Sequence, residues 1–228
     1  MKKLLLLSLL LIPIFCFGQK HKKEDILKIQ KDTIENWMNT EYFKIDSSNI
    51  VVSKIINDIQ GTKDELYIRV KNFFTRYYND ANSIIQTDDK ESGTIIGKGF
   101  NKISYFGFSR TTFADISSPF MGTVNFNYYH ILRVDIKDNR IRIICSVNEM
   151  EEDIKKHYFN TKQEVNSSDS YRIADYPPFT NKRDDNIDKS EETLTSVFTE
   201  LIEKMHITID TVEKTIKEGA IKGENDDW

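Results

Sequence analysis

The sequence predicts an α+β protein in which one antiparallel sheet carries two helices on a single face. Apolar and polar residues alternate over 126–137 and again over 140–147, which is typical of strands buried on one side. Apolar residues recur every three or four positions over about 63–79 and 190–219, which predicts two amphipathic helices. Because each helix has one apolar stripe and the sheet one apolar face, the most economical packing places both helices on that face.

The first predicted strand spans residues 49–57, which are rich in β-branched side chains. Thr62 and Glu65 then have the spacing of a capping box, in which each side chain bonds a free backbone amide at the start of a helix. The helix predicted over about 63–79 carries its apolar stripe on Leu66, Val70, Phe73, Phe74 and Tyr77.

Two hairpins are predicted next. Residues 83–87 and 94–103 form the first, joined by a polar turn that ends at Gly93. Residues 104–127 are aromatic and rich in Gly, Ser and Thr, and we expect an edge strand near 105–108 followed by a loop. The second hairpin turns at Asp138 and Asn139, and its buried face comprises Phe126, Tyr128, His130, Leu132, Val134, Ile136, Ile141, Ile143, Cys145 and Val147.

One domain is expected over 46–219, with a sheet core at 46–148, a polar linker at 149–187 and a closing helix at about 190–219. The linker contains Tyr-Pro-Pro-Phe at 176–179, which favours an extended segment. Residues 19–45 are interpreted either as containing a helix over about 24–39 or as a partly ordered arm that docks through Trp37, and 220–228 as a frayed tail. The closing helix carries its stripe on Leu194, Phe198, Leu201, Met205, Ile209, Val212 and Ile216.

Residues 1–18 have the pattern of a secretory signal peptide: two lysines, a short apolar run and small residues before a cut between Gly18 and Gln19. The run is too short for a membrane anchor, which needs roughly 20 residues. Cys16 invites an alternative interpretation as a lipoprotein attachment site, but the large Phe15 before it disfavours lipidation. We therefore expect an exported protein, periplasmic or extracellular after cleavage.

Composition argues against several classes of partner. With 36 acidic and 32 basic residues the net charge is −4, which is not typical of a nucleic-acid binder or of adhesion to anionic lipid. Cys145 is the only cysteine left after cleavage at residue 18, so no intramolecular disulfide is expected. Its apolar, alternating surroundings favour a buried, inert thiol.

Catalytic signatures are missing from the sequence. It contains no G-x-S-x-G elbow, no H-E-x-x-H or C-x-x-C metal motif and no phosphate-cradling glycine loop. His130 lies on the predicted apolar face, where a satisfied core histidine is favoured over a ligand or switch. The sequence thus predicts no cofactor, no metal and no catalytic residues, and we expect a protein that is not an enzyme.

Three local strings resemble a family of secreted bacterial proteins described as a domain of unknown function with a TBP-like fold. They are KDELY at 63–67, QTDDKESGTIIGKG at 86–99 and VDIKDNRIR at 134–142. The resemblance implies a β-α-β-β-β-β-α topology over roughly 46–148, completed by the closing helix. The sequence departs from the expected pattern at Asn139, which stands where the tight turn would have Gly.

Fold analogy adds two leads. The TATA-binding protein reads DNA with the open face of such a sheet, a use that the acidic balance and export argue against here. Helix-grip proteins of related topology hold apolar ligands between a sheet and a long helix, and a pocket of that kind would be lined by Tyr105, Phe106, Phe108, Phe126 and Tyr128.

Three hypotheses follow, and a non-catalytic module that binds an envelope component, or a second copy of the chain, is favoured. Its contact surface would be the solvent face of the sheet around Tyr129, Arg133, Arg140 and Arg142. The alternatives are a carrier or sensor of an apolar small molecule and, less favoured, an enzyme whose site is assembled from distant residues.

Overall fold

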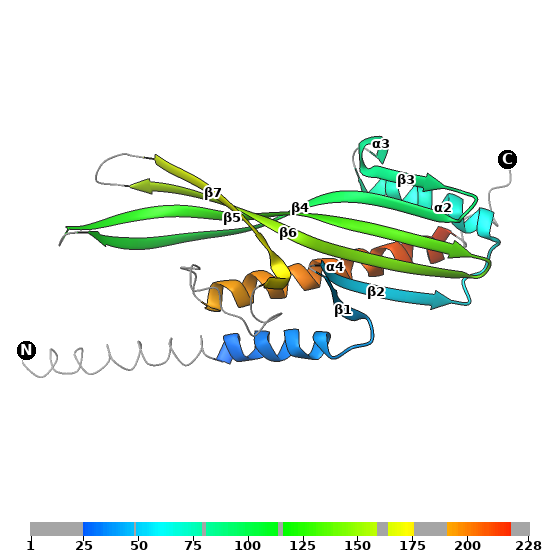
Figure 1. Cartoon of the computed structure of the whole chain (residues 1–228), viewed down its shortest axis with the longest axis horizontal. Coiled ribbons are helices and arrows are strands. Elements are labelled where there is room, and N and C mark those ends of the chain that lie inside the picture. The colour runs from blue at the N-terminus through cyan, green and yellow to red at the C-terminus, as the bar shows by residue number, and fades with distance from the viewer. Residues whose placement is uncertain are drawn as a thin grey trace, which may run out of the picture.

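A computed structural model describes residues 25–47, 49–78, 81–113, 116–158, 164–175 and 191–219. Seven strands form one antiparallel sheet in the order β1-β2-β6-β5-β4-β3, with β7 also paired to β6 (Figure 1). The strands are β1 (Phe43–Asp46), β2 (Asn49–Asn57), β3 (Ile85–Asp89), β4 (Thr94–Phe113), β5 (Ile116–Lys137), β6 (Arg140–Tyr158) and β7 (Glu164–Arg172). The helices are an N-terminal helix over 25–38, α2 (Lys63–Tyr77), α3 (Ala81–Ile84), the 3-10 turn η1 (Ile173–Asp175) and α4 (Glu191–Gly219).

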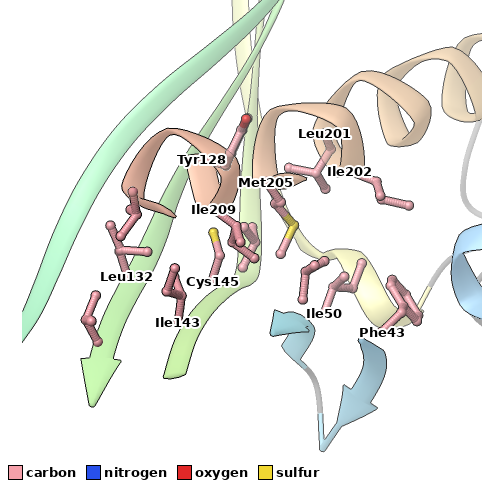
Figure 2. Close-up of a cluster of buried hydrophobic side chains, with 14 of the residues drawn as sticks. Phe43, Ile50, Tyr128, Leu132, Ile143, Cys145, Leu201, Ile202, Met205 and Ile209 are labelled. Atoms are coloured by element: carbon pink, nitrogen blue, oxygen red, sulfur yellow. The ribbon is translucent and has the colours of Figure 1, made fainter. Parts of the chain in front are cut away.

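The order β2-α2-β3-β4-β5-β6-α4 is the predicted β-α-β-β-β-β-α topology, and both long helices lie on one face of the sheet. The predicted stripe of α4 is buried along its whole length, from Leu194 to Ile216. Figure 2 shows Leu201, Met205 and Ile209 of this helix against Tyr128 and Cys145 of the sheet. The stripes of α2 and α4 and the inner face of the sheet therefore form one continuous core.

The N-terminal helix packs on the side of α4 that faces away from the sheet. Ile34 is buried, and the Trp37 ring lies 5.4 Å from the His206 ring of α4. Ser196 Oγ also donates a hydrogen bond to Gln30 Oε1 at 3.2 Å. Of the two alternatives, the helix is the one present, and Trp37 lies at its contact with α4; the sheet begins earlier than expected, because β1 starts at Phe43.

The end of the β5–β6 hairpin is tied to the start of α2. Thr62 and Glu65 form the predicted capping box, and Lys63 N donates a hydrogen bond to Asp138 Oδ1 at 2.7 Å. Asn139 N donates to the Gly61 carbonyl at 3.0 Å, and Asn139 has a φ of 56°. Asn thus supplies the left-handed conformation that Gly would otherwise provide at this turn.

The strand predicted near 105–108 is part of β4, but the loop predicted after it is wrong: β4 and β5 form one long hairpin, paired from Thr94 with Asp135 to Phe113 with Ile116. Gly, Ser and Thr suggested a loop, but within this hairpin Gly107 pairs with Gly122 and the strands continue. Pro119 does not interrupt the ladder, because it lies one residue beyond Phe120, where the described pairing of β5 with β6 ends.

The predicted polar linker over 149–187 is also wrong in its first part, because β6 continues to Tyr158 and pairs with β7. A β-bulge hides this continuation in the sequence. On β6, Val147 pairs with His130 and Met150 with Tyr128, so Asn148 and Glu149 together oppose one residue of β5. The extra residue breaks the two-residue alternation after Val147. The predicted extended segment 176–179, the tail 220–228 and the signal peptide lie outside the described residues.

The sheet and α2 approach most closely at Gly97 of β4. A Cβ on this residue would lie 2.4 Å from Cε1 of Phe74, whose side chain is fully buried. We therefore expect Gly97→Ala to lower the free energy of unfolding by about 1–3 kcal/mol, because the aromatic ring cannot move away within a packed core. Urea denaturation of the purified protein measures this change.

Gly219→Ala at the end of α4 is the matched control, since the nearest atom to its Cβ would be 3.5 Å away on Arg69. This variant should unfold at the wild-type urea concentration or slightly above it. Equal stability of the two variants would show that β4 and α2 are not packed as described.

Candidate functional site

The face of the sheet that the helices leave uncovered is the candidate site. On β5 the even-numbered side chains from Phe126 to Ile136 point into the core, so the odd-numbered ones between them point outward. The register aligns Tyr129 with Phe100, Ile131 with Lys98, and Asp135 with Arg142. The outward face thus presents ordered rows of side chains across β4, β5 and β6. We call it the outer face.

An aromatic pair occupies one part of the outer face. The rings of Phe100 and Tyr129 lie 5.4 Å apart, and 53% and 54% of these residues is exposed. Lys98 Nζ lies 4.3 Å from the centre of the Tyr129 ring, a cation–π contact. Two large apolar rings in contact with each other and with solvent are an energetic cost to the free protein, which a partner could remove by covering them.

Further along the outer face, the Asp135 carboxylate of β5 orients two arginines, Arg133 on the same strand and Arg142 on β6. Asp135 Oδ1 accepts from Arg133 Nε at 2.8 Å, and Oδ2 accepts from Arg142 Nε at 2.9 Å and Nη2 at 2.6 Å. Thr94 Oγ1 donates to the same carboxylate at 3.1 Å. These partners lower the pKa of Asp135, although its partial burial acts in the opposite direction. The group is therefore a carboxylate at neutral pH, with two guanidinium groups held in fixed orientations around it.

A shallow hollow of ≈ 170 Å³ lies beside this network, at the end of the β5–β6 hairpin. It is lined by Ile55, Asp135, Lys137, Arg140, Ile141 and Arg142. Among the described residues no carboxylate forms an ion pair with Lys137 or Arg140, and the same holds for Lys98 and Lys102 on β4. The outer face is therefore basic towards the end of the β5–β6 hairpin, on a chain whose net charge is −4, whereas the exposed Glu151 lies on the same face further along, opposite Asn127.

The structure brings Tyr129, Arg133, Arg140 and Arg142, which were predicted as contacts, onto this one face. Sequence reasoning missed Phe100, Lys98 and Ile55, since only the register places them beside the predicted residues. The alternation of exposed Lys98, Phe100 and Lys102 with Gly97 and Gly99 was a usable signal for β4.

The predicted lining of an apolar pocket is distributed differently. Phe126 and Tyr128 are fully buried in the core, and the Tyr105 ring packs edge-on against Phe126 at 6.1 Å. The side chains of Phe106 and Phe108 lie outside the described part of the structure.

Comparison with known families gives one match. Residues 53–146 match the family described as a domain of unknown function (DUF4468) with TBP-like fold. This segment is therefore similar to the DUF4468 domains. It includes α2 and β3 to β5, together with the parts of β2 and β6 beside them, and it ends at the residue before Val147, where the β-bulge begins.

Two solved structures are similar to the chain. A DUF4468 family protein from Bacteroides ovatus matches with 15% identity and a TM-score of 0.47, over 78% of this chain and 91% of its own. A TBP-like protein from Parabacteroides distasonis matches with 13% identity and a TM-score of 0.42, over 75% and 96%. The sequence matches no curated protein.

A buried polar cluster lies on the opposite, inner face of the sheet. His130 Nε2 is 2.8 Å from the Tyr78 hydroxyl, and Nδ1 is 3.0 Å from Asn101 Nδ2. A Cβ at Gly99 would lie 2.3 Å from Cε1 of the imidazole, so this glycine makes room for the ring. Both ring nitrogens therefore have partners, which confirms the expected satisfied core histidine.

Two buried groups of the interior, His130 and Cys145, have pKa values that are shifted by burial. Burial lowers the pKa of His130 to about 4 and raises that of Cys145 to about 12, so both are neutral at pH 7. Among the described side chains no three His, Cys, Asp or Glu residues are grouped so that they could hold a metal ion. Of the helices in the described ranges, none is long and apolar enough to span a membrane.

His130 should make the fold sensitive to mild acid. Its pKa is about 4 when folded and near 6.5 when exposed, so the unfolded state binds a proton first as the pH falls. Its contribution to stability is complete above about pH 6.5, declines towards pH 4 and is constant below. We expect a loss of about 2 kcal/mol between about pH 7.5 and pH 5, measured by urea denaturation.

His130→Gln should remove most of that loss, whatever its stability at neutral pH. His206→Gln is the control, because His206 is only partly buried and its lowered pKa is opposed by Asp210. An unchanged pH dependence in His130→Gln would contradict the assignment.

Proposed function

We propose that this protein is a non-catalytic binding module of the cell envelope and that the outer face is its contact surface. The observation that carries the proposal is the exposed pair Phe100 and Tyr129, which has Lys98 beside it. The strands that carry this pair are packed against the described helices on the opposite face only, so the pair is accessible to a partner. Interface cores are enriched in aromatic residues and arginine, and both kinds of side chain are present on this face.

Energy favours covering this surface. Moving a large apolar side chain from solvent into a packed interface stabilises the complex by about 1.5–3 kcal/mol. About half of Phe100 and of Tyr129 is already buried, so covering each side chain with a partner would contribute about half of that free energy. The sheet beneath them is rigid because its other side is packed against α2 and α4, so little ordering free energy opposes binding.

The interior supports a non-catalytic role. The groups best suited to proton transfer or nucleophilic attack, His130 and Cys145, are buried and neutral, and both nitrogens of His130 are hydrogen bonded. Phe126 and Tyr128 are fully buried on the inner face, and Figure 2 shows Tyr128 beside α4, so we place binding on the outer face and not beneath the helix.

Site-specific photo-crosslinking in the cells that make the protein tests this proposal. A photoreactive phenylalanine analogue at Tyr129 or Phe100 should give one discrete adduct on irradiation, since a bound partner would lie directly over these rings. The adduct is detected by gel shift and identified by mass spectrometry.

The same analogue at Ile68 of α2 or Ile207 of α4 is the control. Both residues are more than half exposed, but they lie on the helical side of the molecule. Absence of an adduct at Tyr129 and Phe100, or equal labelling from the helical positions, would refute the outer face as the contact surface.

A further inference from the structure

We propose that the outer face binds an acidic polypeptide segment, with a carboxylate in the hollow at Lys137 and Arg140 and an apolar side chain over Phe100 and Tyr129. This inference rests on the proposed function and names the chemistry of the partner. Its three supports are the charge of the face, the distance between the two subsites and the shape of the hollow.

The charge of the outer face selects an anion. Asp135 is already engaged by Arg133 and Arg142, so two positive charges meet one negative charge. Lys98, Lys102, Lys137 and Arg140 add cations that no described carboxylate neutralises. By contrast, Lys54 on β2 is paired with both Asp210 and Glu213 of α4, on the covered side of the sheet. An acidic ligand would therefore restore charge balance where the chain itself does not.

The two subsites are separated along one strand. Tyr129 marks the aromatic subsite and Asp135 the edge of the hollow, six residues further along β5. At about 3.3 Å per residue this distance is roughly 20 Å. An extended polypeptide of about seven residues spans it, with alternate side chains directed at the sheet.

The shape of the hollow favours a side chain over a flat anionic surface. Cations surround its volume of ≈ 170 Å³, and Ile55 provides an exposed apolar side chain at its edge, whereas the Ile141 side chain is buried in the core. An aspartate or glutamate can place its methylene groups against Ile55 and its carboxylate among the cations. The head groups of a bilayer would meet the rim without filling the cavity. The Asp135 carboxylate also fixes the Arg142 guanidinium, which presents its remaining N–H groups with less loss of entropy.

Fluorescence anisotropy with the purified full chain and a labelled random copolymer of glutamate and tyrosine tests the inference. We expect saturable binding that weakens as salt is raised, and none of comparable affinity for a lysine–tyrosine copolymer. The double variant Lys137→Gln/Arg140→Gln should weaken binding about 10-fold or more, because it removes two charged contacts to the bound carboxylate. Tyr129→Ser should weaken it as well.

The matched control is Lys214→Gln/Lys217→Gln, which removes the same charge from the exposed side of α4. Its affinity should remain within about twofold of wild type, as expected for a change far from the subsites. Circular dichroism checks that both double variants fold, and within the described ranges neither Lys137 nor Arg140 has an ion pair whose loss could unfold the protein.

Three outcomes would overturn the inference. Failure to bind the glutamate–tyrosine copolymer, or an equal loss in both double variants, shows that no acidic segment is recognised at the hollow. Tighter binding to phosphatidylglycerol vesicles or to polygalacturonate than to the copolymer assigns the face to a lipid surface or a glycan. A Tyr129 crosslink to a partner without an acidic segment at the contact overturns the inference but leaves the proposed function standing.

Discussion

Burial of the α4 stripe against the sheet is the contact on which the rest of the structure depends. Residues from Leu194 to Ile216 are withdrawn from water on the inner face, and the N-terminal helix covers α4 from behind. The ion pairs of Lys54 with Asp210 and Glu213 then fix the helix along β2. Since all helical cover lies on one side, the side chains of the opposite side are left for contact with other molecules.

Close approach on the inner face shapes the outer one. Gly97 and Gly99 let the Phe74 and His130 rings contact the backbone of β4, and between and beyond them Lys98 and Phe100 point outward. On β4 the glycines therefore face the core and the large residues Lys98 and Phe100 face solvent, because successive residues of a strand point to opposite sides. The same strand that contacts α2 thus places the exposed ring of Phe100 beside that of Tyr129.

Much of the fold could be predicted from local physical chemistry. The capping box at Thr62, the turn at Asn139 and the stripes of α2 and α4 depend on residues close in sequence, and each is confirmed except for Tyr77 of the α2 stripe, which is exposed. The continuation of β6 was missed because the bulge at Asn148 and Glu149 shifts the alternation by one residue. The site was half predicted: Tyr129, Arg133, Arg140 and Arg142 follow from alternation, but their neighbours Phe100, Lys98 and Ile55 follow only from the register between strands.

The bulge also divides the sheet into two regions with different neighbours. Up to Val147, β6 is bordered by β2, and from Glu149 onward it is bordered by β7, so the two partners never compete for the same backbone groups. A change in the length of β6 and β7 beyond the bulge therefore leaves the register between β6 and β2 unchanged. The far part of the sheet can be lengthened, shortened or exchanged during evolution or protein engineering while the pairing of β6 with β2 and the surface it supports stay in place.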